Sequence, residues 1–433
     1  MNRSYAYLSH AKPCRRPGAT RARLRLSLPA LFVAFLVVFF APCLSAQAAL
    51  PKIEITPPAS FTKGTPNYQM KFHTTSSGMP GSGGSHRMVN LALSAQPGPA
   101  GGATPKAWHM IPSGMQMGEY LPLVPPVQQP DSPRGQADPN YKPEKMVIKT
   151  YWGCSETVRP GQPNVLDTSK MTPQNMPDMS AFASKGGKSY GAYGGASAKA
   201  GRNTVLWPNQ QDSRQVPAGA SLVGEHFVHG NLVPHIKFSM DAKHDIMKAL
   251  HVATQGQSQQ DAITVRWNKL PTAIGYHVMA IGANSSGREM VMWTSSETPN
   301  VNVSGQFIDT PQVNKHISAK VILPADRDSC TIPRGIFAAT SPPMIMVTAW
   351  GADYWAAYPP RPANAPKEWK PDWSVKGQFL STANVMFGMP SRGAGHDTPD
   401  SGQGGGANAP RGRGRSTEEA APDVVKGILR GLF

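Results

Sequence analysis

Four residues with metal-binding side chains lie close together in a stretch rich in glycine and proline. They are His109, Met110, Met115 and Met117. Thioether sulfur and neutral imidazole are ligands that suit Cu(I). The same side chains also suit a second role, because methionine fills irregular gaps in hydrophobic cores and can anchor a loop there. The sequence leaves both alternatives open, a copper site and an anchoring role.

A second group of imidazole side chains follows at His226, His229 and His235, next to Glu225. Neutral histidine is the commonest metal ligand in proteins. Residues 226 and 229 of a β-strand point to opposite faces, so they would share a metal ion only around a turn. The copper hypothesis therefore rests on the first group.

The residue types of an enzyme active site do not combine into a recognisable motif. The 26 acidic residues are scattered over 433 positions, and Ser295 and Ser296 lack the Gly-x-Ser-x-Gly context of a nucleophile elbow. The triplet at 187–189 matches the end of a phosphate-binding loop, but Phe182 stands where that loop requires glycine. We expect neither catalysis nor nucleotide binding, and no cofactor.

The first 48 residues have the three parts of an export signal. Seven lysines and arginines precede an apolar run at 28–40, and residues 46–48 read Ala-Gln-Ala, the small-x-small pattern of a cleavage site. We predict cleavage after Ala48. The alternative is an uncleaved anchor over residues 28–50, since about 20 apolar residues can span a bilayer. Both place the rest of the chain outside the cytoplasm.

The cysteines predict one disulfide bond. Cys14 and Cys43 lie in the export segment, which leaves Cys154 and Cys330 in an oxidising compartment, where thiols tend to pair. Each lies beside a predicted strand, so each can be held rigidly enough for a bond. Two buried free thiols, or a bond between two molecules, are the alternatives.

Composition indicates a basic chain with long loops. Without residues 1–48 the formal net charge is +10, because seven of the 43 lysines and arginines and no acidic residue lie in that segment. Glycine (42) and proline (43) are well above the usual share of about 12%. The positive charge favours association with anionic surfaces of the cell envelope. It does not predict a specific nucleic-acid site.

Short segments of alternating polarity predict a mainly β fold. In the region 49–220, Tyr68, Met70 and Phe72 fall on one face of a strand. In the region 221–387 the alternation at 263–267 and 276–281 predicts a hairpin-like strand pair. Further strands are expected at residues 88–93, 145–152, 290–293, 320–323, 344–350 and 375–380. Short strands at this spacing favour a sandwich at 221–387 beside a β-rich region with long loops.

Part of the second region resembles a fibronectin type III domain. Residues 263–267, ending in Trp267, and the segment around Tyr276 are similar to its second and third strands, where a tryptophan and a tyrosine build the core. Residues 344–349 resemble its sixth strand. Met344 stands where that family has tyrosine, and Cys330 is outside its pattern, so an immunoglobulin-like antiparallel sandwich is the broader expectation. The resemblance implies a fold and no activity.

A second resemblance rests on three short segments. They are Tyr151-Trp152-Gly153-Cys154, Arg159-Pro160-Gly161-Gln162-Pro163 and the residues 290–297. Together they are similar to an uncharacterised family of exported proteins of Gram-negative bacteria. The resemblance implies a periplasmic or outer-membrane-associated location and no chemistry.

The end of the chain is expected to form a linker and a short helix. Residues 388–421 are rich in glycine, proline and polar residues and should form a disordered linker. Residues 184–201 and 388–415 should be the first sites of proteolysis. An apolar stripe at helical spacing follows within 422–433, comprising Val424, Val425, Ile428, Leu429, Leu432 and Phe433. So short a helix needs a surface to fold against, namely its own protein, a partner or a membrane.

The sequence as a whole therefore predicts a non-catalytic protein of the cell envelope, of binding or structural type. Its partner is an unknown envelope protein, a polymer or a membrane surface. The alternative is a periplasmic copper-binding protein that uses His109, Met110, Met115 and Met117.

Overall fold

The computed structural model describes residues 66–78, 84–96, 98–127, 146–170, 203–299, 302–366 and 369–389. The predicted export segment, the segment 184–201, most of the predicted linker and the predicted helix at 422–433 lie outside these residues. Within them no helix has the length and apolar character needed to cross a membrane.

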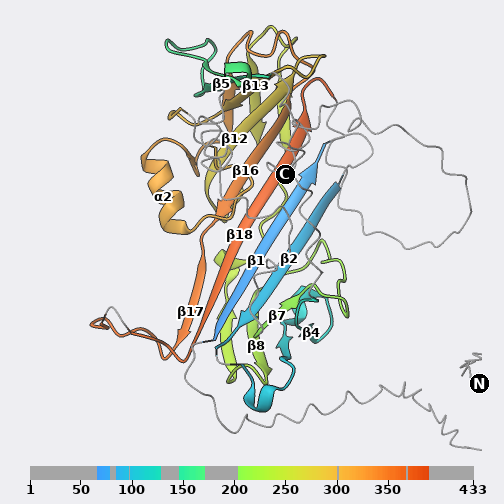
Figure 1. Cartoon of the computed structure of the whole chain (residues 1–433), viewed down its shortest axis with the longest axis vertical. Coiled ribbons are helices and arrows are strands. Elements are labelled where there is room, and N and C mark those ends of the chain that lie inside the picture. Colours follow the sequence, from blue (N-terminus) through green and yellow to red (C-terminus); the bar gives the residue numbers. More distant parts are fainter. Residues whose placement is uncertain are drawn as a thin grey trace, which may run out of the picture. The chain divides into compact units, whose positions relative to one another are not determined.

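The described chain is mainly β and forms three sheets (Figure 1). The strand order of the large sheet is β6 (Asn164–Asp167), β5 (Val147–Trp152), β13 (Glu289–Thr294), β12 (Ala273–Ala283), β16 (Met344–Gly351), β18 (Trp373–Met386), β1 (Asn67–Ser77), β2 (Gly84–Ser94) and β7 (Thr204–Trp207). Two further strands join it, β14 (Leu323–Pro324) on β12 and β17 (Tyr354–Tyr358) on β18. The β1–β18 and β5–β13 pairs are parallel, and the others are antiparallel.

Two smaller sheets complete the strands. One has the order β10 (Val252–Gln255), β11 (Ile263–Trp267), β15 (Ser329–Ile332). The other has the order β4 (Tyr120–Leu123), β3 (Ala107–Met110), β8 (Gly224–Gly230), β9 (Ile236–Met240). The helical elements are α2 (Thr310–Ser318) and the 3-10 turns η1 (Ala100–Gly102), η2 (Ser113–Met115), η3 (Thr168–Lys170) and η4 (Ala242–His244).

Alternation along the strands separates the two faces of the large sheet. In β1, Tyr68, Met70 and Phe72 are buried, as their period of two predicts. They belong to one hydrophobic core that also contains residues of both smaller sheets, such as Val228 and Val265. The smaller sheets therefore cover the same face of the large sheet.

The opposite face carries α2, which the sequence reading missed. Val313 of this helix is buried in a separate cluster with Trp350 of β16 and Leu380 of β18. The Trp350 indole N–H also donates to the carbonyl of Gln306, at 2.7 Å. The loop that leads into α2 is thus held against the sheet.

Strands from both sides of the expected boundary at residues 220 and 221 pair within the large sheet. The longest example is β1, whose 11 residues pair in parallel with β18. All the described residues belong to one compact unit. The described parts of 49–220 and 221–387 therefore share their main sheet and their core.

The predicted hairpin of residues 263–267 and 276–281 is wrong. β11 pairs with β10 and β15, whereas β12 pairs with β13 and β16. The two strands lie in different sheets because the chain crosses the core between them. Trp267 and Tyr276 meet across that core with ring centroids 5.5 Å apart, and the Tyr276 hydroxyl accepts a hydrogen bond from the Leu270 backbone N–H at 2.7 Å.

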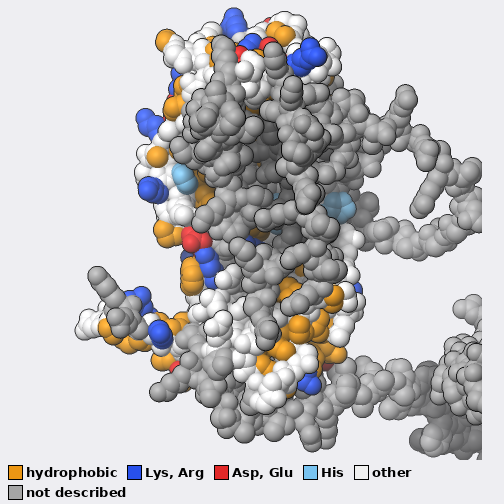
Figure 2. Space-filling model, in the orientation of Figure 1, with side chains coloured by type: hydrophobic (Ala, Val, Ile, Leu, Met, Phe, Trp, Pro, Cys, Tyr) orange, Lys and Arg blue, Asp and Glu red, His pale blue; other side chains and the backbone are white. Residues whose placement is uncertain are grey.

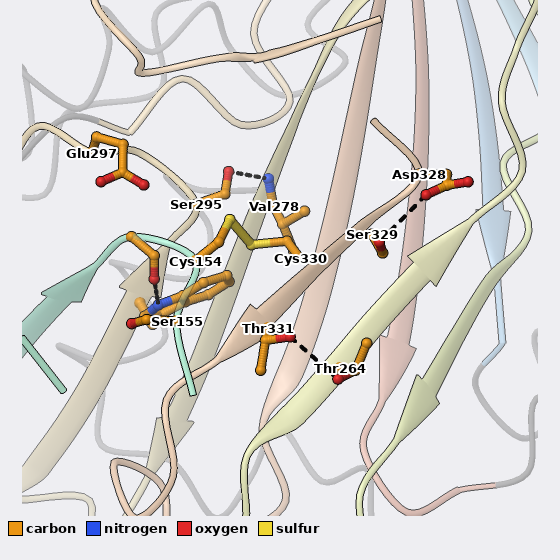
Figure 3. Close-up of a disulfide and its surroundings, with 12 residues drawn as sticks. Cys154, Ser155, Thr264, Val278, Ser295, Glu297, Asp328, Ser329, Cys330 and Thr331 are labelled. Atoms are coloured by element: carbon orange, nitrogen blue, oxygen red, sulfur yellow. Dashed lines mark hydrogen bonds between the residues drawn. A yellow bond between two sulfur atoms is a disulfide. The ribbon is translucent and has the colours of Figure 1, made fainter. Parts of the chain in front are cut away.

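Cys154 and Cys330 form a disulfide bond, as predicted (Figure 3). Their Cα atoms are 5.3 Å apart, within the range that such bonds require. The bond joins the end of β5 to β15 and closes a loop across 176 residues of sequence separation. It ties the large sheet to the three-stranded sheet.

The segments that carry the second family resemblance meet at this corner. Gly153 has a φ of +88°, a conformation that favours glycine, and turns the chain into Cys154. The Arg159 guanidinium donates to the Cys154 carbonyl at 3.1 Å and pairs with Glu297. Gln162 exchanges two hydrogen bonds with the backbone of Trp152. In the structure these residues therefore help to connect the large sheet to the three-stranded sheet.

Candidate ligand-binding site

A cavity of about 470 Å³ lies on the face of the large sheet that carries α2. This volume is in the usual range for a small-ligand site, about 300 to 1,000 Å³. Its lining is mostly polar and comprises Gln69, Lys71, Gln306, Phe307, Ile308, Asp309, Gln312, Lys376 and Gln378. The cavity is therefore a candidate functional site within the described residues.

The floor of the cavity is set by the register of β1 and β18. Gln69 lies opposite Lys376, and Lys71 lies opposite Gln378 one row further along. Residues that face each other across a strand pair share a face of the sheet. These four side chains are the polar half of the alternation whose apolar half, beginning with Tyr68, enters the core.

The wall of the cavity comes from the start of α2 and the loop before it. The Thr310 backbone N–H donates to the Asp353 carboxylate at 3.2 Å, and the Asp353 backbone N–H donates to the Thr310 hydroxyl at 2.7 Å. The Gln312 side chain accepts from the Asp309 backbone N–H at 3.3 Å. These bonds fix the beginning of the helix against the turn between β16 and β17.

The charges in and around the cavity balance. Lys376 pairs with Asp309 and lies 3.8 Å from Asp353, and the Gln378 amide donates to Asp309 at 3.0 Å. The Lys71 ammonium lies over the Phe307 ring, 5.3 Å from its centroid. Two cations thus face two carboxylates, and the site has no strong net charge.

Burial shifts the pKa values of two of these groups. It lowers the pKa of Lys71, a change that the neighbouring Lys376 charge increases and Asp309 opposes. It raises the pKa of Asp353, which the Thr310 N–H and Lys376 oppose. Both shifts follow from the cost of removing a charge from water.

Trp355 borders this floor on the outer side. It lies opposite Lys376 in the β17–β18 register, so the row across three strands runs from Gln69 through Lys376 to Trp355. The Lys376 ammonium is 4.8 Å from the centroid of the indole, and 60% of Trp355 is exposed. Figure 2 shows acidic and basic side chains side by side between α2 and β17, next to hydrophobic ones.

The four residues of the copper hypothesis occupy a different part of the fold. His109 and Met110 belong to β3 rather than to a loop, and as neighbours in a strand they point to opposite faces. Met115 and Met117 are buried in the main hydrophobic core, as expected if they anchor this part of the chain there. Copper binding by this set remains a prediction, and elemental analysis of protein from copper-fed cells would test it.

His109 instead joins a buried chain of hydrogen bonds. Its Nδ1 lies 2.8 Å from the Tyr68 hydroxyl, and its Nε2 lies 3.0 Å from Nδ1 of His226. Nε2 of His226 lies 2.7 Å from the Leu222 carbonyl oxygen. Because a carbonyl only accepts, every donor is determined: His226 donates to Leu222, His109 donates to His226, and Tyr68 donates to His109. Both imidazoles are neutral in this arrangement.

The other imidazoles of the second group lie apart from this chain. His229 stacks on Trp108, with centroids 5.4 Å apart, and His235 contacts Phe227. Among the described residues, no three His, Cys, Asp or Glu side chains are grouped as metal ligands would be.

None of the cavity residues was singled out from the sequence. Gln69 and Lys71 are ordinary polar positions of an amphipathic strand, which usually face water. No local pattern marks the cavity residues, because they come from β1, β18 and α2 with the segment before it, which are far apart in the sequence.

Sequence comparison finds no matching family profile and no matching curated protein. Among solved structures, the zebrafish Fcho1 Mu homology domain with bound Eps15 peptide is 7% identical over 76% of this chain and 99% of its own, with a TM-score of 0.20. The yeast delta-COP-I mu-homology domain is 9% identical over 75% of this chain and 98% of its own, with a TM-score of 0.19. Similarity at this level defines neither the fold nor the function of this chain.

Proposed function

We propose that this chain is an exported, non-catalytic binding protein of the cell envelope that holds its ligand in the cavity between β1, β18 and α2. The observation that carries the proposal is the cavity itself, a built recess lined by hydrogen-bonding side chains on a rigid sheet. Its lining consists of amides, two lysines, one aspartate and two apolar residues, a set suited to hydrogen bonding.

We also propose that the second half of the chain is an immunoglobulin or fibronectin type III-like sandwich. The sheet β10-β11-β15 and the neighbouring strands β13-β12-β16-β18 would be its two layers, with Trp267 and Tyr276 between them. The remaining strands of the large sheet would then be additions to its edges. This arrangement supports the resemblance stated from the sequence.

Export to the periplasm or outer membrane is part of the proposal. The disulfide bond supports it, because such bonds persist in oxidising compartments. Osmotic-shock fractionation should recover the protein outside the cytoplasm, and its intact mass should correspond to a chain beginning at residue 49. Recovery with the cytoplasmic marker proteins would refute this part.

The cavity itself is tested by sedimentation with isolated cell envelopes. Gln69 lines the cavity and is exposed, so Gln69→Leu removes a donor and an acceptor without disturbing the core. Gln255 is exposed on β10, and Gln255→Leu is the matched control. Gln69→Leu should weaken envelope binding about tenfold, the equivalent of one good hydrogen-bonding contact. Equal sedimentation of the two variants would refute the site.

A further inference from the structure

We propose that the ligand is an uncharged oligosaccharide segment of an envelope polymer. This proposal rests on the proposed function. One sugar ring would stack on Trp355, and the hydroxyls of the adjoining sugar would enter the cavity. Three observations support this: the amide lining, the charge balance and the exposed indole at the end of the same row.

The amides match the chemistry of sugar hydroxyls. A hydroxyl both donates and accepts, and a glutamine side chain offers two donors and an acceptor at once. Gln69 supplies such groups from the floor. Gln378 donates one N–H to Asp309 and keeps its oxygen for a ligand, and Gln312 accepts from the Asp309 N–H and keeps its two N–H donors. Phe307 adds an apolar surface beside them, suited to the C–H groups of a sugar ring.

The charge balance disfavours a polyanion. Without residues 1–48 the chain still has a formal net charge of +10, so lysines and arginines are available for an anion-binding site. Yet Lys376 is paired with Asp309, and Asp353 lies 3.8 Å away from the same ammonium. An anionic polymer would meet the Asp309 carboxylate in the lining, and like charges repel, while Lys376 is already paired with that carboxylate.

Trp355 gives the site a flat apolar platform. It is 60% exposed, whereas most of the large aromatic side chains of the described fold are buried in cores. Lys376 connects it to the cavity, because this lysine contacts the indole and also lines the floor. A ligand longer than one sugar can therefore reach both surfaces.

The location on a sheet face disfavours an extended peptide. Peptides that add to sheets use unpaired backbone groups of an edge strand. β1 is paired on one side with β2 and on the other with β18, so its backbone has no free edge in the cavity. Recognition there must use side chains, which suits a ligand with many hydroxyls.

Isothermal titration of the protein purified from its native compartment tests the inference. The probes are uncharged hexasaccharides of glucose, mannose, galactose and N-acetylglucosamine, with a hexagalacturonate as the anionic probe and an extended hexapeptide as the peptide probe. At least one uncharged sugar should bind and change the tryptophan fluorescence. Trp355→Ala should weaken binding about tenfold, and Trp355→Phe should keep part of it.

Tyr358 provides the matched control. It is 55% exposed in the same strand but lies opposite Trp373, on the other face of the ribbon. Tyr358→Ala should leave sugar binding unchanged. The inference is overturned if no uncharged sugar binds, or if hexagalacturonate or the peptide binds more tightly than the uncharged sugars. It is also overturned if Trp355→Ala and Tyr358→Ala bind the sugar with equal affinity. Loss of envelope binding in Gln69→Leu alongside any of these results would leave the proposed binding function intact.

Discussion

Mild acid should unfold this protein, because several histidines are buried in the neutral form. His73, His109 and His277 are at most 6% exposed. Burial lowers the pKa of His73 to about 4 and that of His277 to about 3, and it holds the pKa of His109 well below the ordinary value of 6.5. His226 is shifted in the same direction, also mainly by burial.

The free energy of unfolding should decrease in acid because the unfolded chain binds more protons than the folded chain. Between pH 6.5 and the lowered values, an unfolded chain protonates these histidines while the folded chain does not. The unfolded state then binds more protons, so the free energy of unfolding falls as the pH falls through this window. Above about pH 7.5 the unfolded histidines are almost wholly neutral as well, and these residues cause little pH dependence.

The magnitude is large. From pH 7 to pH 5, a histidine with a reference pKa of about 6.5 and a folded pKa of 4 or below costs about 2 kcal/mol. His73 and His277 together cost about 4 kcal/mol, a large part of the stability of a typical domain, about 5 to 15 kcal/mol. The hydrogen-bonded chain of His109 adds a structural reason, because a protonated imidazole cannot accept from the Tyr68 hydroxyl.

Urea unfolding followed by tryptophan fluorescence at pH 7, 6 and 5 measures this. His73→Gln should remove about 2 kcal/mol of the difference between pH 7 and pH 5. The exposed His251→Gln is the control and should leave the difference unchanged. A free energy of unfolding that is equal at pH 7 and pH 5, or an equal pH dependence in all three proteins, would refute the reasoning.

Three further predictions concern the disulfide, the core and the end of the chain. Reducing the Cys154–Cys330 bond should lower the free energy of unfolding by about 2 to 4 kcal/mol, measured in urea with and without reductant; two alkylated cysteines in the unreduced protein would contradict the bond. Tyr276→Phe should cost about 1 to 3 kcal/mol, since the Leu270 N–H would lose its buried acceptor; a stability equal to that of the unmodified protein would count against it. Deleting residues 424–433 should release the protein from the membrane fraction, and unchanged fractionation would remove the membrane role of that segment.

Local patterns were enough to identify fewer than half of the described strands, namely β1, β2, β5, β11, β12, β13, β16 and β18. The alternation at Tyr68, Met70 and Phe72, and the runs that became β11, β16 and β18, reflect a period of two that depends only on neighbouring residues. α2 was missed because its nine residues contain few apolar positions, with Val313 as the buried one. A proline at its start was the available signal.

The sequence by itself determined that the fold is mainly β, that Tyr68, Met70 and Phe72 enter the core and which two cysteines pair, because alternation and elimination are readable along the chain. Only the tertiary structure decided which strands are neighbours. The parallel pairing of β1 with β18 joins residues about 300 positions apart, and contacts of that range leave no local pattern. The cavity exists because this pairing places Gln69 beside Lys376 and because α2 covers the same face, so its residues had no common signature in the sequence.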